Sequence, residues 1–335
     1  MTLLELTDVS ISYSVDSTEL HAVDTVSFDA NEGEIIGIVG ESGCGKTTLA
    51  KSILRLLPPN GRVTGGEITW KGQNLLQSSK KELNKSIRWK EISWIAQSAM
   101  NALDPVYTVE AQLRETLKIH SYDEKPIDEH IDQLLQSVGI DPGRKRNYPH
   151  ELSGGQRQRV VIALALALDP PLIIADEPTT GLDVGIQKEI LDLITEIQTD
   201  RGLTMLLITH DINVVAEIAD RVLVMYAGQL IEVGSKQEIF ENPVHPYTIG
   251  LQNAFPRLGQ RSRTLVTIPG APPNLVNPAS GCRFKSRCPF ATEKCSLDPP
   301  LTSTANGHAA KCHYTDNKEE FQDKGRIPET WVDHS

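Results

Sequence analysis

No apolar run in this sequence is long enough to cross a membrane. The longest apolar stretch covers positions 160–168, whereas a membrane-spanning helix needs about 20 residues. The first residues also lack the basic segment and the long apolar core of a signal peptide. We therefore expect a cytoplasmic protein, and other subunits must hold it in place if it works at a membrane.

An excess of basic residues is missing as well. The 335 residues include 33 Lys and Arg against 44 Asp and Glu, which gives a formal net charge of −11. A general nucleic-acid-binding protein usually presents a basic face, so this composition disfavours that class. We interpret the excess of acidic residues as a feature that keeps the protein soluble. No internal repeat is visible, and the length allows one large domain or a domain with a sizeable appendage.

Cysteine is scarce, and most of the cysteines lie close together in the C-terminal part of the sequence. Of five cysteines, four lie at positions 282, 288, 295 and 312. In a cytoplasmic chain such crowding favours a metal site over disulfides. Four thiolates can enclose zinc or an iron–sulfur cluster. The intervening gaps of five, six and sixteen residues are wider than the paired spacing of zinc ribbons, and spacing alone leaves the metal open.

Hydrophobic patterns predict an α/β fold. Residues 35–39 are almost wholly apolar, which is typical of a strand covered on both faces. Strand and helix patterns alternate along the chain, which implies a mostly parallel sheet. A hairpin over residues 222–233, turning at Ala227-Gly228, adds an antiparallel part. Further strands are expected at 9–13, 91–97, 172–176 and 204–209, and helices at 48–57, 109–117, 127–138, 154–168 and 186–199.

Changes in composition and in hydrophobic pattern divide the chain into parts. We predict an α/β core in two parts, 1–97 and 153–240, interrupted by a helical subdomain over 98–152. A C-terminal region with the cysteine cluster follows at 241–320, then a tail at 321–335. Prolines become frequent beyond position 240, and the charged sequence from about position 315 predicts disorder.

The segment at 40–48 reads GESGCGKTT and predicts a phosphate-binding loop. Its glycines let the backbone bend tightly and turn its N–H groups toward one point. The following helix adds its positive N-terminal end. Lys46 can reach the β- and γ-phosphates of a nucleotide, and the Thr47 hydroxyl can bind Mg²⁺. The predicted ATP-binding residues of this segment are Gly40, Ser42, Gly43, Cys44, Gly45, Lys46, Thr47 and Thr48.

Two acids end the predicted strand at 172–176. Asp176 can hold the metal ion. Glu177 follows directly, so that one acid can serve the metal while the other polarises the attacking water. Within the phosphate loop, the thiol of Cys44 could make the site sensitive to oxidation.

The pentapeptide Leu152-Ser153-Gly154-Gly155-Gln156 lies between the loop and the acids. Ser153 is a good helix N-cap, and the start of a helix is an anion site. These motifs, in this order, resemble the ATPase subunit of an ABC transporter. The resemblance implies a RecA-like P-loop NTPase core and a head-to-tail dimer that sandwiches two ATP molecules. The residues implied to contact the ATP of a partner subunit are Ser153, Gly154, Gly155, Gln156 and Asp183.

The same resemblance assigns further roles. Tyr13 occupies the position of the aromatic residue that stacks on adenine, and His210 that of the switch histidine at the γ-phosphate. Gln97 corresponds to the glutamine that touches Mg²⁺ and senses the transmembrane partner. The implied catalytic set is Glu177, His210, Lys46 and Gln97, and the implied Mg²⁺ set is Thr47, Gln97 and Asp176.

Longer segments are similar to one branch of that family, the oligopeptide, dipeptide and nickel importers. They are residues 149–156, 175–180, 225–229 and 242–248. Members of the dipeptide group carry a [4Fe–4S] cluster in their C-terminal region, which here implies Cys282, Cys288, Cys295 and Cys312 as ligands, with zinc as the alternative. The chain is expected to be an ATPase that powers import of di- and oligopeptides from the cytoplasmic face of the cell membrane.

The expected partners follow from that branch. They are a second ATPase subunit, identical or paralogous, two transmembrane permeases and, indirectly, an extracytoplasmic solute-binding protein, but no nucleic acid. The same ATPase could serve oligosaccharide or nickel import, because cargo does not touch this subunit. A soluble ABC protein of translation or DNA repair is more remote, because those carry two cassettes or a long coiled coil.

Overall fold

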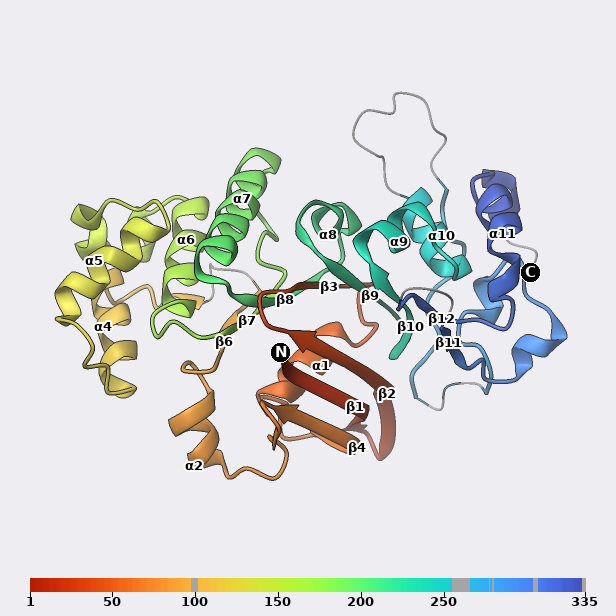
Figure 1. Ribbon diagram of the computed structural model, residues 1–335, viewed down its shortest axis with the longest axis horizontal. Helices are drawn as coiled ribbons and strands as arrows, with labels where there is room; N and C mark the ends of the chain where they lie inside the picture. The colour runs from red at the N-terminus through yellow and green to blue at the C-terminus, as the bar shows by residue number, and fades with distance from the viewer. Residues whose placement is uncertain (98–101, 255–265, 277, 279, 304–306, 333–335) are drawn as a thin grey trace. The chain divides into compact units, whose positions relative to one another are not determined.

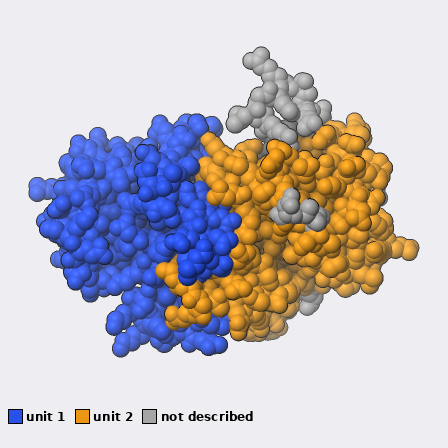
Figure 2. Space-filling view, in the orientation of Figure 1, with its two compact units in different colours: residues 1–3, 30–35, 74–208 blue, residues 4–29, 36–73, 209–335 orange. Residues whose placement is uncertain are grey.

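The computed structural model describes residues 1–97, 102–254, 266–276, 278, 280–303 and 307–332. The chain divides into two compact units (Figure 2). Unit 1 comprises residues 1–3, 30–35 and 74–208, and unit 2 comprises residues 4–29, 36–73 and 209–335. The predicted start of the helical subdomain, residue 98, lies outside the described residues. Among the described residues, no helix is long and apolar enough to span a membrane.

Unit 1 contains three parallel strands. Ile92 of β6 pairs with Leu172 of β7, which in turn pairs with Thr204 of β8. Strands β7 and β8 are buried along their whole length because their residues are almost all apolar, as in a strand covered on both faces. The elements are β6 (Ile92–Ile95), β7 (Leu172–Asp176), β8 (Thr204–Thr209), α2 (Lys80–Glu82), a π-helical turn (Leu83–Ile87), α4 (Val109–Ile119), α5 (Ile127–Ser137), 3₁₀ turns (Pro142–Arg146, Pro149–Glu151), α6 (Gly154–Ala165) and α7 (Val184–Arg201).

Helices α4, α5 and α6 of unit 1 pack on one another (Figure 1). Helix α4 buries Val109, Leu113 and Leu117, which recur on one face at the helical period. Thr108 caps its start by accepting a hydrogen bond from the N–H of Ala111 at 3.3 Å. After α5, Gly139 takes the left-handed conformation (φ 70°) that ends a helix. The predicted helices at 109–117 and 127–138 are therefore confirmed.

Unit 2 contains most of an antiparallel sheet in the order β2-β1-β4-β5, and a run of strands in the order β3-β9-β10-β12-β11. In the second group only β3 and β9 pair in parallel. The predicted hairpin turn is confirmed: Ala227 and Gly228, both at positive φ, join β9 to β10. The strands are β1 (Thr2–Val15), β2 (Thr18–Asn31), β3 (Ile35–Val39), β4 (Gly61–Trp70), β5 (Gln73–Asn74), β9 (Arg221–Tyr226), β10 (Gln229–Ser235), β11 (Leu301–Ser303) and β12 (Ala309–Lys311).

Unit 2 also contains helices, including one near its C-terminal end. The expectation of a disordered tail was wrong for the described residues, because a helix containing Phe321 and a 3₁₀ turn containing Trp331 form there, and these two residues are only 6% and 3% exposed. The indole N–H of Trp331 donates to the carbonyl oxygen of Gly325 at 2.9 Å. The helices are α1 (Lys46–Ile53), α8 (Ile212–Ile218), α9 (Lys236–Glu241), α10 (Pro246–Asn253) and α11 (Lys318–Gly325), with 3₁₀ turns at Lys285–Arg287, Glu293–Ser296, Thr315–Asn317 and Pro328–Trp331.

A buried carboxylate joins three segments of unit 2. Glu232 of β10 has 0% of its surface exposed. It accepts hydrogen bonds from the N–H groups of Val244 at 2.7 Å and His245 at 2.9 Å, and from Nε2 of His308 at 2.8 Å. A buried carboxylate is tolerated only with such partners. Glu232 therefore fixes both the start of α10 and the segment before β12.

Substituting Glu232→Ala should destabilise unit 2. Two buried amides lose their acceptor, at about 1–3 kcal/mol each. We expect the thermal midpoint, measured by calorimetry, to fall by about 5 °C or more. Glu241→Ala, at an exposed position of α9, is the matched control. An equal midpoint for both variants would contradict this role of Glu232.

Candidate functional site

The phosphate loop lies in unit 2 between β3 and α1. Gly40, Gly43 and Gly45 have φ values of 153°, 79° and 105°, which residues with a side chain rarely adopt. A Cβ at Gly40 would lie 2.1 Å from the carbonyl oxygen of Met225, and one at Gly45 would lie 2.3 Å from that of Ala22. The glycines thus permit both the sharp turn and the close approach of neighbouring backbone.

Lys46 points into this loop. Its Nζ donates to the carbonyl oxygens of Gly40 at 2.7 Å and Glu41 at 3.0 Å. The residue is only 6% exposed. No side chain caps the start of α1, whose N-cap is Gly45. A buried ammonium group and an uncapped helix start are together suited to a polyanion such as a nucleotide triphosphate.

Cys44 is buried within the phosphate loop. The residue is 3% exposed, and burial raises the pKa of its thiol. Only an accessible thiolate reacts readily with oxidants. Burial in the loop therefore argues against the expected sensitivity of this thiol to oxidation.

Tyr13, the predicted adenine-stacking residue, lies near the end of β1. Its hydroxyl is 3.1 Å from Oγ1 of Thr48, so the structure brings together two predicted ATP-binding residues. Gly61 of the neighbouring strand makes room for the ring, because a Cβ there would lie 2.6 Å from it. The aromatic ring is only partly buried, as a stacking platform requires.

The two acids lie in unit 1, at the end of β7. Asp176 is 2% exposed. Glu177 follows with a φ of 49°, a left-handed conformation that costs about 1–3 kcal/mol outside glycine and that clusters at functional sites. Its Oε2 accepts hydrogen bonds from Nε2 of Gln97 at 2.8 Å and from Oγ1 of Thr180 at 2.9 Å.

Two predicted catalytic residues, Gln97 and Glu177, are thus in direct contact. The contact with Thr180 was not predicted, although Thr180 belongs to the motif that carries the acids. A hydroxyl three residues after a carboxylate, at the start of a turn, is a signal that could have identified it. His210 directly follows β8 and is exposed, and the next residue, Asp211, caps α8.

The glycine-rich pentapeptide starts α6 with a capping box. Oγ of Ser153 accepts from the N–H of Gln156 at 3.2 Å, and Oε1 of Gln156 accepts from the N–H of Ser153 at 3.1 Å. A Cβ on Gly155 would lie 2.7 Å from the Ile186 side chain, so this glycine allows α6 and α7 to pack closely. Asp183 caps α7 by accepting from the N–H of Ile186 at 3.0 Å.

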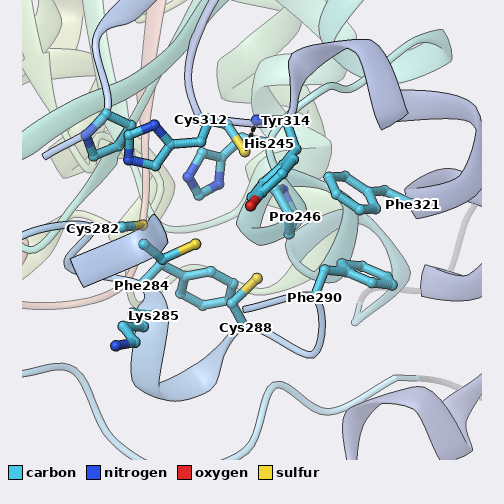
Figure 3. A pocket seen from close by; sticks show the side chains of 13 residues that line it. His245, Pro246, Cys282, Phe284, Lys285, Cys288, Phe290, Cys312, Tyr314 and Phe321 are labelled. Atoms are coloured by element: carbon cyan, nitrogen blue, oxygen red, sulfur yellow. Dashed lines mark hydrogen bonds between the residues drawn. The ribbon is translucent and has the colours of Figure 1, made fainter. Parts of the chain in front are cut away.

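The four C-terminal cysteines line one pocket of unit 2. Cys282, Cys288, Cys295 and Cys312 share its wall with residues such as Phe284 and Phe290 (Figure 3). All four are free thiols. Burial raises the pKa of three of them, Cys282, Cys288 and Cys312, the last to about 11.

Backbone amides approach the sulfur atoms of this pocket. The N–H of Tyr314 donates to Sγ of Cys312 at 3.4 Å. Backbone hydrogen bonding at Phe284 and Phe290 acts against burial and lowers the pKa of the Cys282 and Cys288 thiols. Within the described residues, however, no group of three or more His, Cys, Asp or Glu is arranged to hold a metal ion. The geometry therefore establishes neither zinc nor a cluster.

Comparison with known families yields two matches along the chain. Residues 23–180 match the model of the ABC transporter family. Residues 231–295 match the C-terminal region of oligopeptide/dipeptide transporters, which includes three of the four clustered cysteines.

Individual relatives agree with these matches. The chain is 45% identical over 314 residues to the oligopeptide transport ATP-binding protein OppD of Escherichia coli K12, covering 92% of both chains. It is 45% identical to the dipeptide transport ATP-binding protein DppD of Bacillus subtilis 168, covering 95% of this chain and 96% of the relative. The solved dimer of the ATP-binding cassette MJ0796, bound to ADP and Pi, matches 70% of this chain with a TM-score of 0.62 at 28% identity.

The fold, the phosphate loop and these likenesses agree with one another. The chain belongs to the ABC transporter ATP-binding proteins, in the branch that carries the oligopeptide/dipeptide transporter C-terminal region.

Proposed function

We propose that this chain is the ATP-hydrolysing subunit of an importer for di- and oligopeptides, attached to the cytoplasmic face of the cell membrane by two permease subunits. The observation that carries the ATPase assignment is the loop of three positive-φ glycines around the buried ammonium group of Lys46. The peptide cargo is supported by relatives named as oligopeptide and dipeptide transport proteins. An extracytoplasmic solute-binding protein would deliver the cargo.

In this proposal the RecA-like core binds ATP through the loop residues predicted from the sequence. Lys46 and the loop amides contact the phosphates, and Tyr13 stacks on adenine. Thr47, Asp176 and Gln97 would hold Mg²⁺, which neutralises charge on the β- and γ-phosphates when bound. These residue types suit the ion, which prefers oxygen ligands.

Glu177 is the proposed base that orients the attacking water. The hydrogen bonds from Gln97 and Thr180 fix the orientation of its carboxylate, and such preorganisation is what a catalytic base needs. His210 would stabilise the γ-phosphoryl group during transfer. Because Gln97 contacts the base directly, it can relay contact with a permease to the hydrolysis step.

A second ATPase subunit, identical or paralogous, is proposed to complete each site. The N-terminus of α6 would face the ATP bound to that partner, through Ser153, Gly154, Gly155 and Gln156. Asp183 would reach across the interface between the two subunits. Helix starts bind anions. One relative, the cassette MJ0796, was solved as a dimer, which supports this assembly.

We further propose that the cysteine-lined pocket holds a [4Fe–4S] cluster, with zinc as the alternative. Support comes from four free thiols around one cavity and from the amide of Tyr314, which donates to Sγ of Cys312, because such hydrogen bonds stabilise metal-bound thiolates. A bound cluster would crosslink a segment of short turns that buries little core of its own. Its proposed role is structural.

The substitution Glu177→Gln should abolish hydrolysis and retain nucleotide binding. The amide cannot accept a proton from water, so the ATPase rate should fall by about 10²-fold or more. In ATP and Mg²⁺, size-exclusion chromatography should show a stable dimer of the variant. Asp200→Asn, at an exposed position of α7, is the control. Turnover by Glu177→Gln at the rate of this control would refute the assignment.

Anaerobic purification tests the cluster. We expect a brown protein with absorbance at about 400 nm and about four iron and four sulfide per chain. Cys288→Ser should lose this colour, whereas Cys44→Ser should keep it, because Cys44 lies outside the pocket. A colourless preparation loaded with zinc would overturn the cluster and favour the alternative.

Uptake assays test the cargo. Cells whose only copy of this subunit carries Lys46→Ala should lose uptake of labelled di- and tripeptides, because the variant cannot hold the phosphates. Uptake of nickel and of oligosaccharides by the same cells should be unchanged. Loss of either of these uptakes with peptide uptake intact would assign the ATPase to the other cargo.

A further inference from the structure

Glu41, inside the phosphate loop, is held by residues that come from the C-terminal region. Its peptide N–H donates to the hydroxyl of Tyr247 at 2.9 Å. Its carboxylate accepts from Nη1 of Arg287 at 2.8 Å. The Arg287 side chain is 6% exposed and that of Glu41 is 24% exposed. The loop is therefore fixed at this residue through both its backbone and its side chain.

Arg287 itself is locked in place. Its Nε donates to the carbonyl oxygen of Pro269 at 2.8 Å, and Nη1 also lies 3.3 Å from the hydroxyl of Tyr226. The guanidinium lies 5.7 Å from the centre of the Tyr226 ring, a cation–π distance. A planar guanidinium can make these contacts at once, and a lysine ammonium cannot.

An aromatic cluster links these contacts to the cysteine-lined pocket. The rings of Tyr226 and Tyr247 have centroids 4.7 Å apart, and Phe284 lies 5.2 Å and 5.4 Å from them. Phe284 lines the pocket (Figure 3), and Arg287 directly precedes Cys288. Such packed clusters shift little, so the pocket and the Glu41 end of the loop are joined by rigid contacts.

The other end of the loop is held in a similar way. The N–H of Gly228 donates to the carbonyl oxygen of Cys44 at 2.9 Å. Arg283, which directly follows Cys282, donates to the carbonyl oxygen of Ala227 in the same turn. Each end of the loop is thus connected to an arginine that neighbours a cysteine of the pocket.

The positive charge of Arg287 also affects the charge balance of the phosphate loop. A phosphate-binding loop must accept a polyanion, and the carboxylate of Glu41 belongs to that loop. Unpaired, this negative charge would oppose nucleotide binding at short range, where screening by salt is weak. Arg287 neutralises the carboxylate and keeps it fixed.

We propose that Arg287 is a positioning residue for ATP binding: from the cysteine-rich region it neutralises and holds Glu41, and so maintains the phosphate loop in its binding conformation. This inference rests on the proposed ATPase function. Arg287 need not touch the nucleotide, because it acts through Glu41.

The test measures the dissociation constant of ATP–Mg²⁺ by calorimetry, together with kcat and KM. Arg287→Ala should weaken binding about tenfold and raise KM, while kcat at saturating ATP changes less than about threefold. In the Arg287→Ala background, Glu41→Gln should recover most of the lost affinity, because it removes the unpaired charge. Lys294→Ala removes an exposed basic residue that directly precedes Cys295, and it should bind ATP as the wild type does.

Two further variants keep the proposal testable if Arg287→Ala fails to fold. Arg287→Lys retains the charge without the planar fork and should weaken binding less than Arg287→Ala. Tyr247→Phe removes only the hydroxyl that holds the Glu41 amide and should weaken binding a few-fold. The thermal midpoint of each variant shows whether it is folded.

Wild-type affinity in folded Arg287→Ala, or the absence of rescue by Glu41→Gln, would overturn the proposal. If Arg287→Ala is unfolded, wild-type affinity in both Arg287→Lys and Tyr247→Phe would overturn it. A wild-type protein that binds no ATP would instead refute the proposed function, so the two failures are distinguishable.

Discussion

The backbone of the phosphate loop is the constraint on which unit 2 is built. Three glycines hold conformations that other residues rarely adopt, and two of them are packed against carbonyl oxygens of neighbouring segments. Such a conformation persists only when the surrounding structure maintains it. Strand β3 leads into the loop, α1 continues it, and the β9–β10 turn holds its carbonyl at Cys44. The residues after position 226 extend this support through Tyr247 and Arg287.

In unit 1, too, neighbouring residues hold a strained backbone conformation in place. The strained backbone at Glu177 is fixed by its N–H, which donates to the carbonyl oxygen of Ile208 at 2.8 Å. The side chain is fixed by Gln97 and Thr180. The pentapeptide starts α6 with a capping box, and Asp183 caps the start of α7 through one hydrogen bond. The carboxylate of Glu177 and the first turns of α6 and α7 therefore each have defined hydrogen-bond partners within unit 1.

Local patterns in the sequence were sufficient for much of this structure. Strands β3, β7 and β8 lie at the predicted residues because they are short and mostly apolar. The helical start at Ser153 followed from its capping chemistry. In contrast, β2 and β4 were not predicted, because long antiparallel strands with mixed exposure give no clear period. The terminal helix α11 was not predicted because its sequence is mostly charged, although Phe321 within it and Trp331 in the 3₁₀ turn after it are both buried. The pair of Glu41 and Arg287, separated by 246 positions, depends on tertiary contacts that no local pattern encodes.

In the proposed dimer, each triphosphate is bound by the lysine of one subunit and the serine–glycine turn of another. A structure determined with Mg²⁺ and a non-hydrolysable ATP analogue tests this most directly. The analogue is expected to contact Lys46 of one copy and the start of α6, at Ser153, of a second copy. An analogue enclosed by one copy alone, with residues 153–155 facing solvent in every assembly, would contradict it.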